Sequence, residues 1–158
     1  QMCIREIITQ NNNINIFDLH TLLNDIINEK KLSYPDTVFK LQVEADQSIK
    51  CSFDKTSFQR VLSNLLNNSV EANANKIMIN VQSIHNNLFD LIITDNGVGF
   101  PKEILDNQAK SRMSTKKGGK GLGLTYAYNC INTWGGSLKL SNQNSNAQIR
   151  IQLSKIEL

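Results

Sequence analysis

The chain contains 158 residues, of which 40% are hydrophobic, and its formal net charge is +3. This length and composition predict one domain with an apolar core, and the small charge does not favour nucleic acid as a partner. No apolar run approaches the ~18 residues of a membrane-spanning helix, so we expect a cytoplasmic chain without membrane contact, whether or not a longer protein is membrane-anchored. Cys3, Cys51 and Cys130 form no CxxC pair, so we expect reduced thiols rather than a zinc site.

The first thirteen residues run from a mixed apolar stretch into a polar one. We predict that residues 1–13 are the remnant of an upstream helix followed by a linker. Because the sequence begins at Gln1 without an initiator methionine, we expect a piece of a longer protein. Residues 14–158 are predicted to form the domain itself.

The domain is predicted to begin with a short edge strand at residues 15–17 and a helix capped by Asp18. Four apolar residues at helical spacing should form the buried face of this helix: Leu19, Leu22, Leu23 and Ile26. The charged residues 29–31, with Lys30 at their centre, should form its exposed end. The sequence Ser-Tyr-Pro-Asp at 33–36 should then break the helix.

Strands are predicted where apolar and polar residues alternate. Residues 37–44 alternate in this way, and a short strand is expected at 49–51. Residues 77–81 and 88–95 flank a predicted turn and should form an antiparallel pair.

The C-terminal part is predicted to contain a helix at 122–134, which Gly135 and Gly136 end, and a hairpin of strands 137–141 and 147–153. Strands and helices thus follow one another without βαβ regularity. This order predicts an α+β two-layer sandwich.

The most informative stretch is a predicted helix that begins after Asp54, a suitable N-cap, and ends near residues 73–75. One of its stripes has the spacing of a buried face: Phe58, Val61, Leu62, Leu65, Ser69 and Ala72. Asn64, Asn68 and Glu71 form a second stripe beside it. The second stripe can line a polar pocket, because buried amides need polar partners and an amide oxygen is a suitable ligand for Mg²⁺. The alternative is a solvated helix face.

Residues 91–100 form an apolar run that ends in Asp95-x-Gly97-x-Gly99. The glycines allow the backbone to turn and to approach a ligand closely. A plain Asp-Asn-Gly hairpin turn is the alternative. Against it, the residues after Gly99 do not resume an alternating strand.

Residues 118–124 form a glycine-rich loop that leads into the helix at 122–134. With G-x-G-x-G spacing, Gly119, Gly121 and Gly123 can turn backbone N–H groups towards phosphate at a helix N-terminus. The Rossmann and P-loop motifs do not fit, because no strand directly precedes these glycines and the G-x-x-x-x-G-K-[ST] pattern is missing. A flexible linker is the alternative.

Together and in this order, the three stretches resemble the N, G1 and G2 boxes of the catalytic domain of sensor histidine kinases. That domain belongs to the ATPase superfamily of gyrase, the Hsp90 chaperones, histidine kinases and the MutL repair proteins. The resemblance covers the chain roughly from residue 14 onward. It implies the Bergerat fold, in which about three helices cover one face of a mixed, mostly antiparallel sheet and Mg²⁺-ATP binds between the layers.

The same resemblance implies an activity and its partners. The γ-phosphate of ATP would pass to a histidine on a dimerisation domain of the full-length kinase, and a response regulator would act downstream. The hydrolytic branches carry a glutamate where this chain has Asn64, four residues before the metal-binding asparagine. Without that general base, the resemblance favours transfer to another nucleophile over hydrolysis.

By this resemblance, Asp95 would accept a hydrogen bond from the adenine amine and reject guanine, with Gly97 and Gly99 beside the base. Asn68 would bind the metal, with Asn64 and Glu71 near it. The remaining candidates would contact the nucleotide, chiefly its phosphates: Thr115, Lys116, Gly119, Lys120, Gly121, Leu122, Gly123 and Leu124. Asn64, Asn68 and Lys116 are the candidate catalytic residues.

Two features depart from the family pattern. Residues 100–120 resemble the family's mobile lid, yet 107–113 contain no phenylalanine, so the lid's conformation is not predicted. Neither His20, which lacks an acidic neighbour and a nearby proline, nor His85 in a predicted turn resembles the phosphoacceptor. The alternatives are a nucleotide-binding module without catalysis and a serine kinase of the anti-sigma type.

Overall fold

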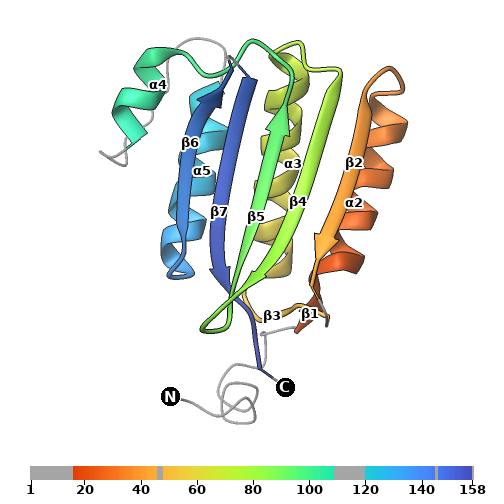
Figure 1. The fold of residues 1–158 in the computed structure, drawn as a ribbon, viewed down its shortest axis with the longest axis vertical. Helices are drawn as coiled ribbons and strands as arrows, with labels where there is room; N and C mark the ends of the chain where they lie inside the picture. The colour runs from red at the N-terminus through yellow and green to blue at the C-terminus, as the bar shows by residue number, and fades with distance from the viewer. Residues whose placement is uncertain (1–15, 46–47, 109–119, 145, 158) are drawn as a thin grey trace.

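The computed structural model describes residues 16–45, 48–108, 120–144 and 146–157. A five-stranded sheet forms one layer, and helices cover one of its faces (Figure 1). The covering helices are α2 (Leu19–Ser33), α3 (Lys55–Glu71) and α5 (Lys120–Thr133). This arrangement confirms the predicted α+β two-layer fold.

The strands of the sheet lie side by side in the order β2, β4, β5, β7, β6. Their bounds, in the same order, are Val38–Glu44, Lys76–Ile84, Leu88–Asp95, Asn146–Ser154 and Ser137–Gln143. β2 runs parallel to β4, and the other neighbouring pairs are antiparallel, so the sheet is mixed as predicted. The final hairpin is longer than expected, and Asn142, predicted to lie in its loop, belongs to β6.

The predicted strand near residues 15–17 does not join this sheet. β1 (Phe17–Asp18) pairs with β3 (Lys50–Cys51) in a separate two-stranded sheet. The Lys50 ammonium lies 3.1 Å from the Asp18 carboxylate, which also accepts a hydrogen bond from the Thr21 N–H at 2.9 Å. Asp18 therefore caps α2 as predicted and ties its start to the chain that leads into α3.

The prediction that Lys30 is exposed is wrong. Lys30 is only 5% exposed, and its Nζ donates a hydrogen bond of 2.8 Å to Asn67 Oδ1 on α3. The Tyr34 hydroxyl donates to the same oxygen at 3.1 Å. Burial lowers the pKa of Lys30. The helical spacing from Ile26 puts Lys30 on the buried stripe, where its aliphatic stem can pack while one amide partners its charge.

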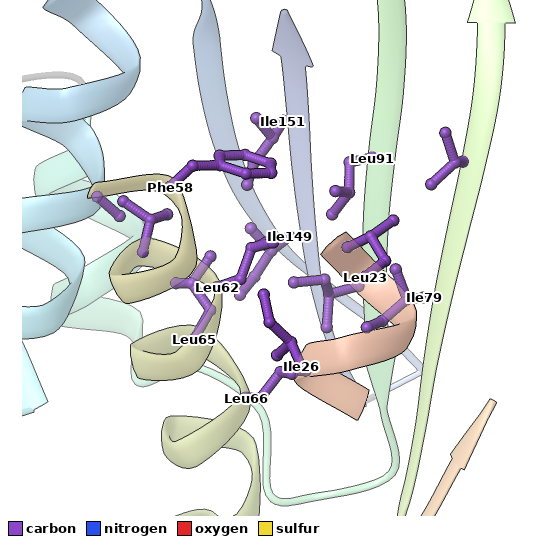
Figure 2. Close-up of a cluster of buried hydrophobic side chains, with 14 of the residues drawn as sticks. Leu23, Ile26, Phe58, Leu62, Leu65, Leu66, Ile79, Leu91, Ile149 and Ile151 are labelled. Atoms are coloured by element: carbon purple, nitrogen blue, oxygen red, sulfur yellow. The ribbon is translucent and has the colours of Figure 1, made fainter. Parts of the chain in front are cut away.

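The core lies between α2, α3 and the sheet. On α3 the predicted stripe is buried from Phe58 to Ser69, and Leu66, which the pattern did not include, is buried as well. Figure 2 shows the side chains that meet there: Leu23, Ile26, Phe58, Leu62, Leu65, Leu66, Ile79, Leu91, Ile149 and Ile151. Each residue of this cluster is at most 5% exposed. Burial of one such side chain contributes about 1.5–3 kcal/mol, so the core fixes α3 firmly on the sheet.

The turn after β5 is seated on the C-terminal end of α3. The Val98 N–H donates to the Ala72 carbonyl oxygen at 3.1 Å. A Cβ added at Gly97 would lie 2.6 Å from the same oxygen, and Gly99 has a φ of +81°. Glycine is therefore required at position 97 by close contact with α3 and at position 99 by its left-handed conformation.

We predict that Gly97→Ala lowers the free energy of unfolding by ~1–3 kcal/mol, because its methyl group would overlap a backbone oxygen. Gly123→Ala is the matched control. A Cβ at Gly123 would lie 3.4 Å from Asn68 Nδ2, an ordinary contact, and alanine is favoured over glycine inside a helix. Urea unfolding measures both, and equal midpoints for the two variants would contradict the seating of this turn.

The two described cysteines should react differently. Cys51 is 0% exposed, and burial, together with the nearby Asp18 charge, raises the pKa of its thiol to about 12. Cys130 on α5 is partly exposed. Since the thiolate is the reactive form, a thiol reagent at pH 8 should label Cys130 in the folded protein and Cys51 only after unfolding. Peptide mass spectrometry assigns the labels, and equal native labelling of both residues would refute the burial of Cys51.

Candidate functional site

A pocket of about 150 Å³ lies where α3, α5, the turn after β5 and the start of β7 come together. Its lining is mostly apolar: Leu65, Ala72, Val98, Phe100, Pro101, Ile104, Leu124, Ala147 and Ile149. Asn68, Ser69, Asp95 and Gly99 supply its polar part. Larger hollows lie elsewhere on the molecule, but this pocket takes residues from all three sequence motifs. It is therefore the candidate site.

Asp95 is the carboxylate of this pocket. It is the last residue of β5 and is only 7% exposed. The Gly97 N–H donates a hydrogen bond of 2.8 Å to Asp95 Oδ1, which orients the side chain. A buried acceptor held in this way, among apolar walls, can bind one donor of a flat heterocycle and fix its orientation.

Asn96 shows why the motif is not a hairpin turn, so that alternative is wrong. Its Oδ1 accepts hydrogen bonds from the N–H groups of Asn75 and Lys76, at 2.9 and 3.0 Å. Its Nδ2 donates to Asn75 Oδ1 at 2.7 Å. After this attachment to the start of β4, the chain continues into α4 (Lys102–Asn107) rather than into a paired strand.

Asn64 and Asn68 lie against the first turn of α5. A Cβ at Gly123 would be 3.4 Å from Asn68 Nδ2 and 3.5 Å from Asn64 Cβ. About one turn earlier in α3 and one turn later in α5, the Arg60 guanidinium lies 4.3 Å from the centre of the Tyr126 ring. α5 therefore runs antiparallel to α3, and its N-terminal end lies next to Asn64 and Asn68, which we call the asparagine stripe. Backbone N–H groups and the positive end of a helix dipole favour anions at such a place.

The residues present fit a magnesium ion bound with a nucleotide. Asn68 lines the pocket and can offer an amide oxygen. In the described ranges, no three His, Cys, Asp or Glu side chains are grouped as a metal site. A divalent ion beside Asn68 would thus depend on phosphate oxygens and water, which is the usual habit of Mg²⁺.

The structure brings together only some of the predicted site residues. Asn68, Asp95, Gly99 and Leu124 line the pocket, while Asn64 and Gly123 lie directly beside it. Gly97 is seated on α3, and Glu71 is exposed and outside the pocket lining. The others fall outside what the structure describes: Thr115, Lys116 and Gly119 entirely, and Lys120, Gly121 and Leu122 beyond their place in the first turn of α5.

Phe100, Pro101 and Ile104 form the outer wall of the pocket and were not predicted as site residues. The available signal was the run Glu103-Ile104-Leu105, whose composition is compatible with a single helical turn, and these residues lie in α4. The alternation of Ile149 and Ile151 with polar residues indicates that Ile149 faces inward, but not that it lines a pocket. None of the described helices is long and apolar enough to cross a membrane.

Comparison with known proteins indicates a family for this chain. A family model described as "Histidine kinase-, DNA gyrase B-, and HSP90-like ATPase" matches residues 53–156. An NtrY-like protein of Rickettsia bellii is 26% identical over 148 residues, covering 89% of this chain but only 24% of that relative.

Two solved structures share the fold. The mycobacterial sensor histidine kinase MprB matches with a TM-score of 0.77 and 20% identity, over 92% of this chain and 99% of that one. The catalytic domain of histidine kinase ThkA matches with a TM-score of 0.75 and 22% identity, over 90% and 95%. Because the family model covers most of the sequence, the chain belongs to the histidine kinase-, DNA gyrase B- and HSP90-like ATPase family.

Proposed function

We propose that this chain binds Mg²⁺-ATP and donates the γ-phosphate to a histidine on a dimerisation domain of a longer protein, upstream of a response regulator. The observation that carries the proposal is the convergence of the three motifs on α3. Asp95 and Asn68 both line the pocket. Asn68 also lies next to Gly123, as does Asn64.

Asp95 supports adenine as the base. One of its oxygens is held by the Gly97 N–H, and the carboxylate keeps acceptor capacity for the exocyclic amine of adenine. Guanine presents an oxygen at the corresponding position and would face a buried negative charge. The apolar residues around Asp95 suit the flat faces of the base.

The position of the asparagine stripe is an argument for Mg²⁺ and phosphate binding at this end of the pocket. Asn68 is proposed as the protein ligand of Mg²⁺, and Asn64 as a neutral neighbour of the phosphates. Thr115, Lys116, Gly119, Lys120 and Gly121 remain proposed phosphate contacts, with Leu122 and Leu124 at the start of the helix.

The character of position 64 supports transfer rather than hydrolysis. Asp95 is the one carboxylate among the residues that line the pocket, and its hydrogen bond to Gly97 keeps it in the G1 turn. Asn64, next to the α5 N-terminus, is neutral and cannot deprotonate water. An acceptor histidine supplied by another domain would then be the nucleophile.

The first test concerns the base. Asp95→Asn keeps the size of the side chain but loses the charge-assisted bond, and should weaken ATP binding by ~1.5–3 kcal/mol in calorimetry. GTP is the control ligand, since wild-type protein should bind it much more weakly than ATP. Unchanged ATP affinity in the variant, or equal affinity for both nucleotides in the wild type, would refute this role.

The second test concerns the reaction. Asn68→Ala should abolish Mg²⁺-dependent ATP binding, whereas Asn129→Ala, an exposed asparagine on α5, should leave it unchanged. Asn64→Glu supplies a carboxylate one turn from Asn68 and should raise slow ATP hydrolysis measurably, within the ~10²–10⁴-fold range of general-base catalysis.

The readouts are phosphate release by the chain alone and transfer of labelled phosphate to a separately prepared histidine-bearing domain. Rapid hydrolysis by the wild-type chain without any transfer would place the protein with the hydrolytic branch. ATP binding without either reaction would favour a non-catalytic module, and label on a serine of a partner protein would favour an anti-sigma-type kinase.

A further inference from the structure

The outer wall of the nucleotide pocket is a short segment with little support of its own. Phe100, Pro101 and Ile104 line the pocket, yet α4 has no buried residue. Pro101 at the start of α4 makes no side-chain capping hydrogen bond. Contacts outside the segment must therefore hold this wall in place.

The first such contact joins Phe100 to β6. Asn142 Oδ1 accepts a hydrogen bond of 2.8 Å from the Phe100 N–H. Asn142 Nδ2 donates one of 2.9 Å to the Phe100 carbonyl oxygen. A single amide side chain thus pairs with both backbone groups of the first residue of the wall.

The second contact closes the other end of the segment. Gln108 Oε1 accepts a hydrogen bond of 2.8 Å from the Leu140 N–H, and Gln108 Nε2 donates to the Leu140 carbonyl oxygen at 3.0 Å. The same Nε2 also donates to the carbonyl oxygen of Leu105 in α4, at 3.1 Å. We call these two pairings, Asn142 with Phe100 and Gln108 with Leu140, the amide clamps.

Both clamps join the outer wall to the sheet next to the inner wall of the pocket, which Ala147 and Ile149 of β7 form. β6 is an edge strand, and β7 is its neighbour. Asn142 pairs with Ala147 and Leu140 pairs with Ile149, and both partners line the pocket. The clamps therefore attach the outer wall to β6, the neighbour of the strand that carries Ala147 and Ile149. Figure 1 shows α4 next to β6 at this edge of the sheet.

We propose that Asn142 and Gln108 are positioning residues for the nucleotide base, acting through Phe100 and Ile104. The inference rests on the proposed binding of ATP in this pocket. The base needs walls on both of its faces at a fixed separation. Ordering these walls before the ligand arrives removes part of the entropic cost of binding. Capping of a sheet edge alone is the competing explanation, and it predicts no effect on the base.

The test uses the whole 158-residue chain and adenosine as the probe, because adenosine has no phosphate. Asn142→Ala and Gln108→Leu each remove one clamp and should weaken adenosine binding roughly 5- to 10-fold. ATP binding should weaken by the same factor, since the lost contact concerns the base. Gln143→Ala, the adjacent exposed amide on β6, is the matched control and should bind like wild type.

The kinetics give a readout that a purely structural role would not move. In transfer to a separate histidine-bearing domain, the clamp variants should raise the KM for ATP and leave kcat at saturating ATP unchanged. Loss of folded protein would instead lower the apparent kcat at constant KM. Circular dichroism at the assay temperature confirms folding, and if Asn142→Ala does not fold, Gln108→Leu and the neutral, size-matched Asn142→Leu decide the outcome.

Folded clamp variants that bind adenosine as tightly as wild type would overturn the role of the clamps while the proposed function stands. A larger loss for ATP than for adenosine would overturn it too, because the clamps would then act on the phosphates. Wild-type protein that binds neither adenosine nor ATP would overturn the proposed function itself, and with it this inference.

Discussion

The site depends on the seating of one turn on the end of one helix. The Ala72 carbonyl oxygen at the C-terminus of α3 accepts the Val98 N–H, and Gly97 passes so close to that oxygen that no larger residue fits. This contact brings Asp95, which belongs to the sheet, next to the asparagine stripe, which belongs to a helix. Because the core fixes α3 on the sheet, the distance between Asp95, the proposed base-recognition residue, and Asn68, the proposed metal ligand, is set by the fold.

In the proposed complex, the two ends of the nucleotide would meet different chemistry along α3. Near Ala72 the surroundings are apolar, and Asp95 is the charged exception. Nearer the first turn of α5, the neutral amides of Asn64 and Asn68 lie beside Gly123. An apolar pocket with one carboxylate selects a base with a donor, whereas amides and N–H groups tolerate the high negative charge of phosphates. The same helix can serve both because its C-terminal and middle turns contact different elements.

Local physical chemistry made much of the fold predictable. Asp18 and Asp54 cap their helices through their own side chains, and alternation identified β4 and β5 because their inner faces are buried. Motif spacing made Asp95 and Asn68 candidates for one site, and both line the same pocket. The roles of Lys30, Asn142 and Gln108 were not predictable, since each depends on a partner on another element at least 32 residues away along the chain. A polar residue whose role depends on a distant partner has no local pattern to reveal it.

The frequency of amides at these junctions has a physical reason. A backbone peptide exposes one donor and one acceptor, and only an amide side chain can satisfy both at once with matching geometry. Asn142 does this for Phe100, Gln108 for Leu140, and Asn96 joins the end of β5 to the start of β4. A carboxylate at any of these places would lack the donor and add negative charge near a triphosphate, while a lysine would lack the acceptor. Neutral amides therefore hold the pocket without adding charge, so that Asp95 is the charged side chain among the described residues that line it.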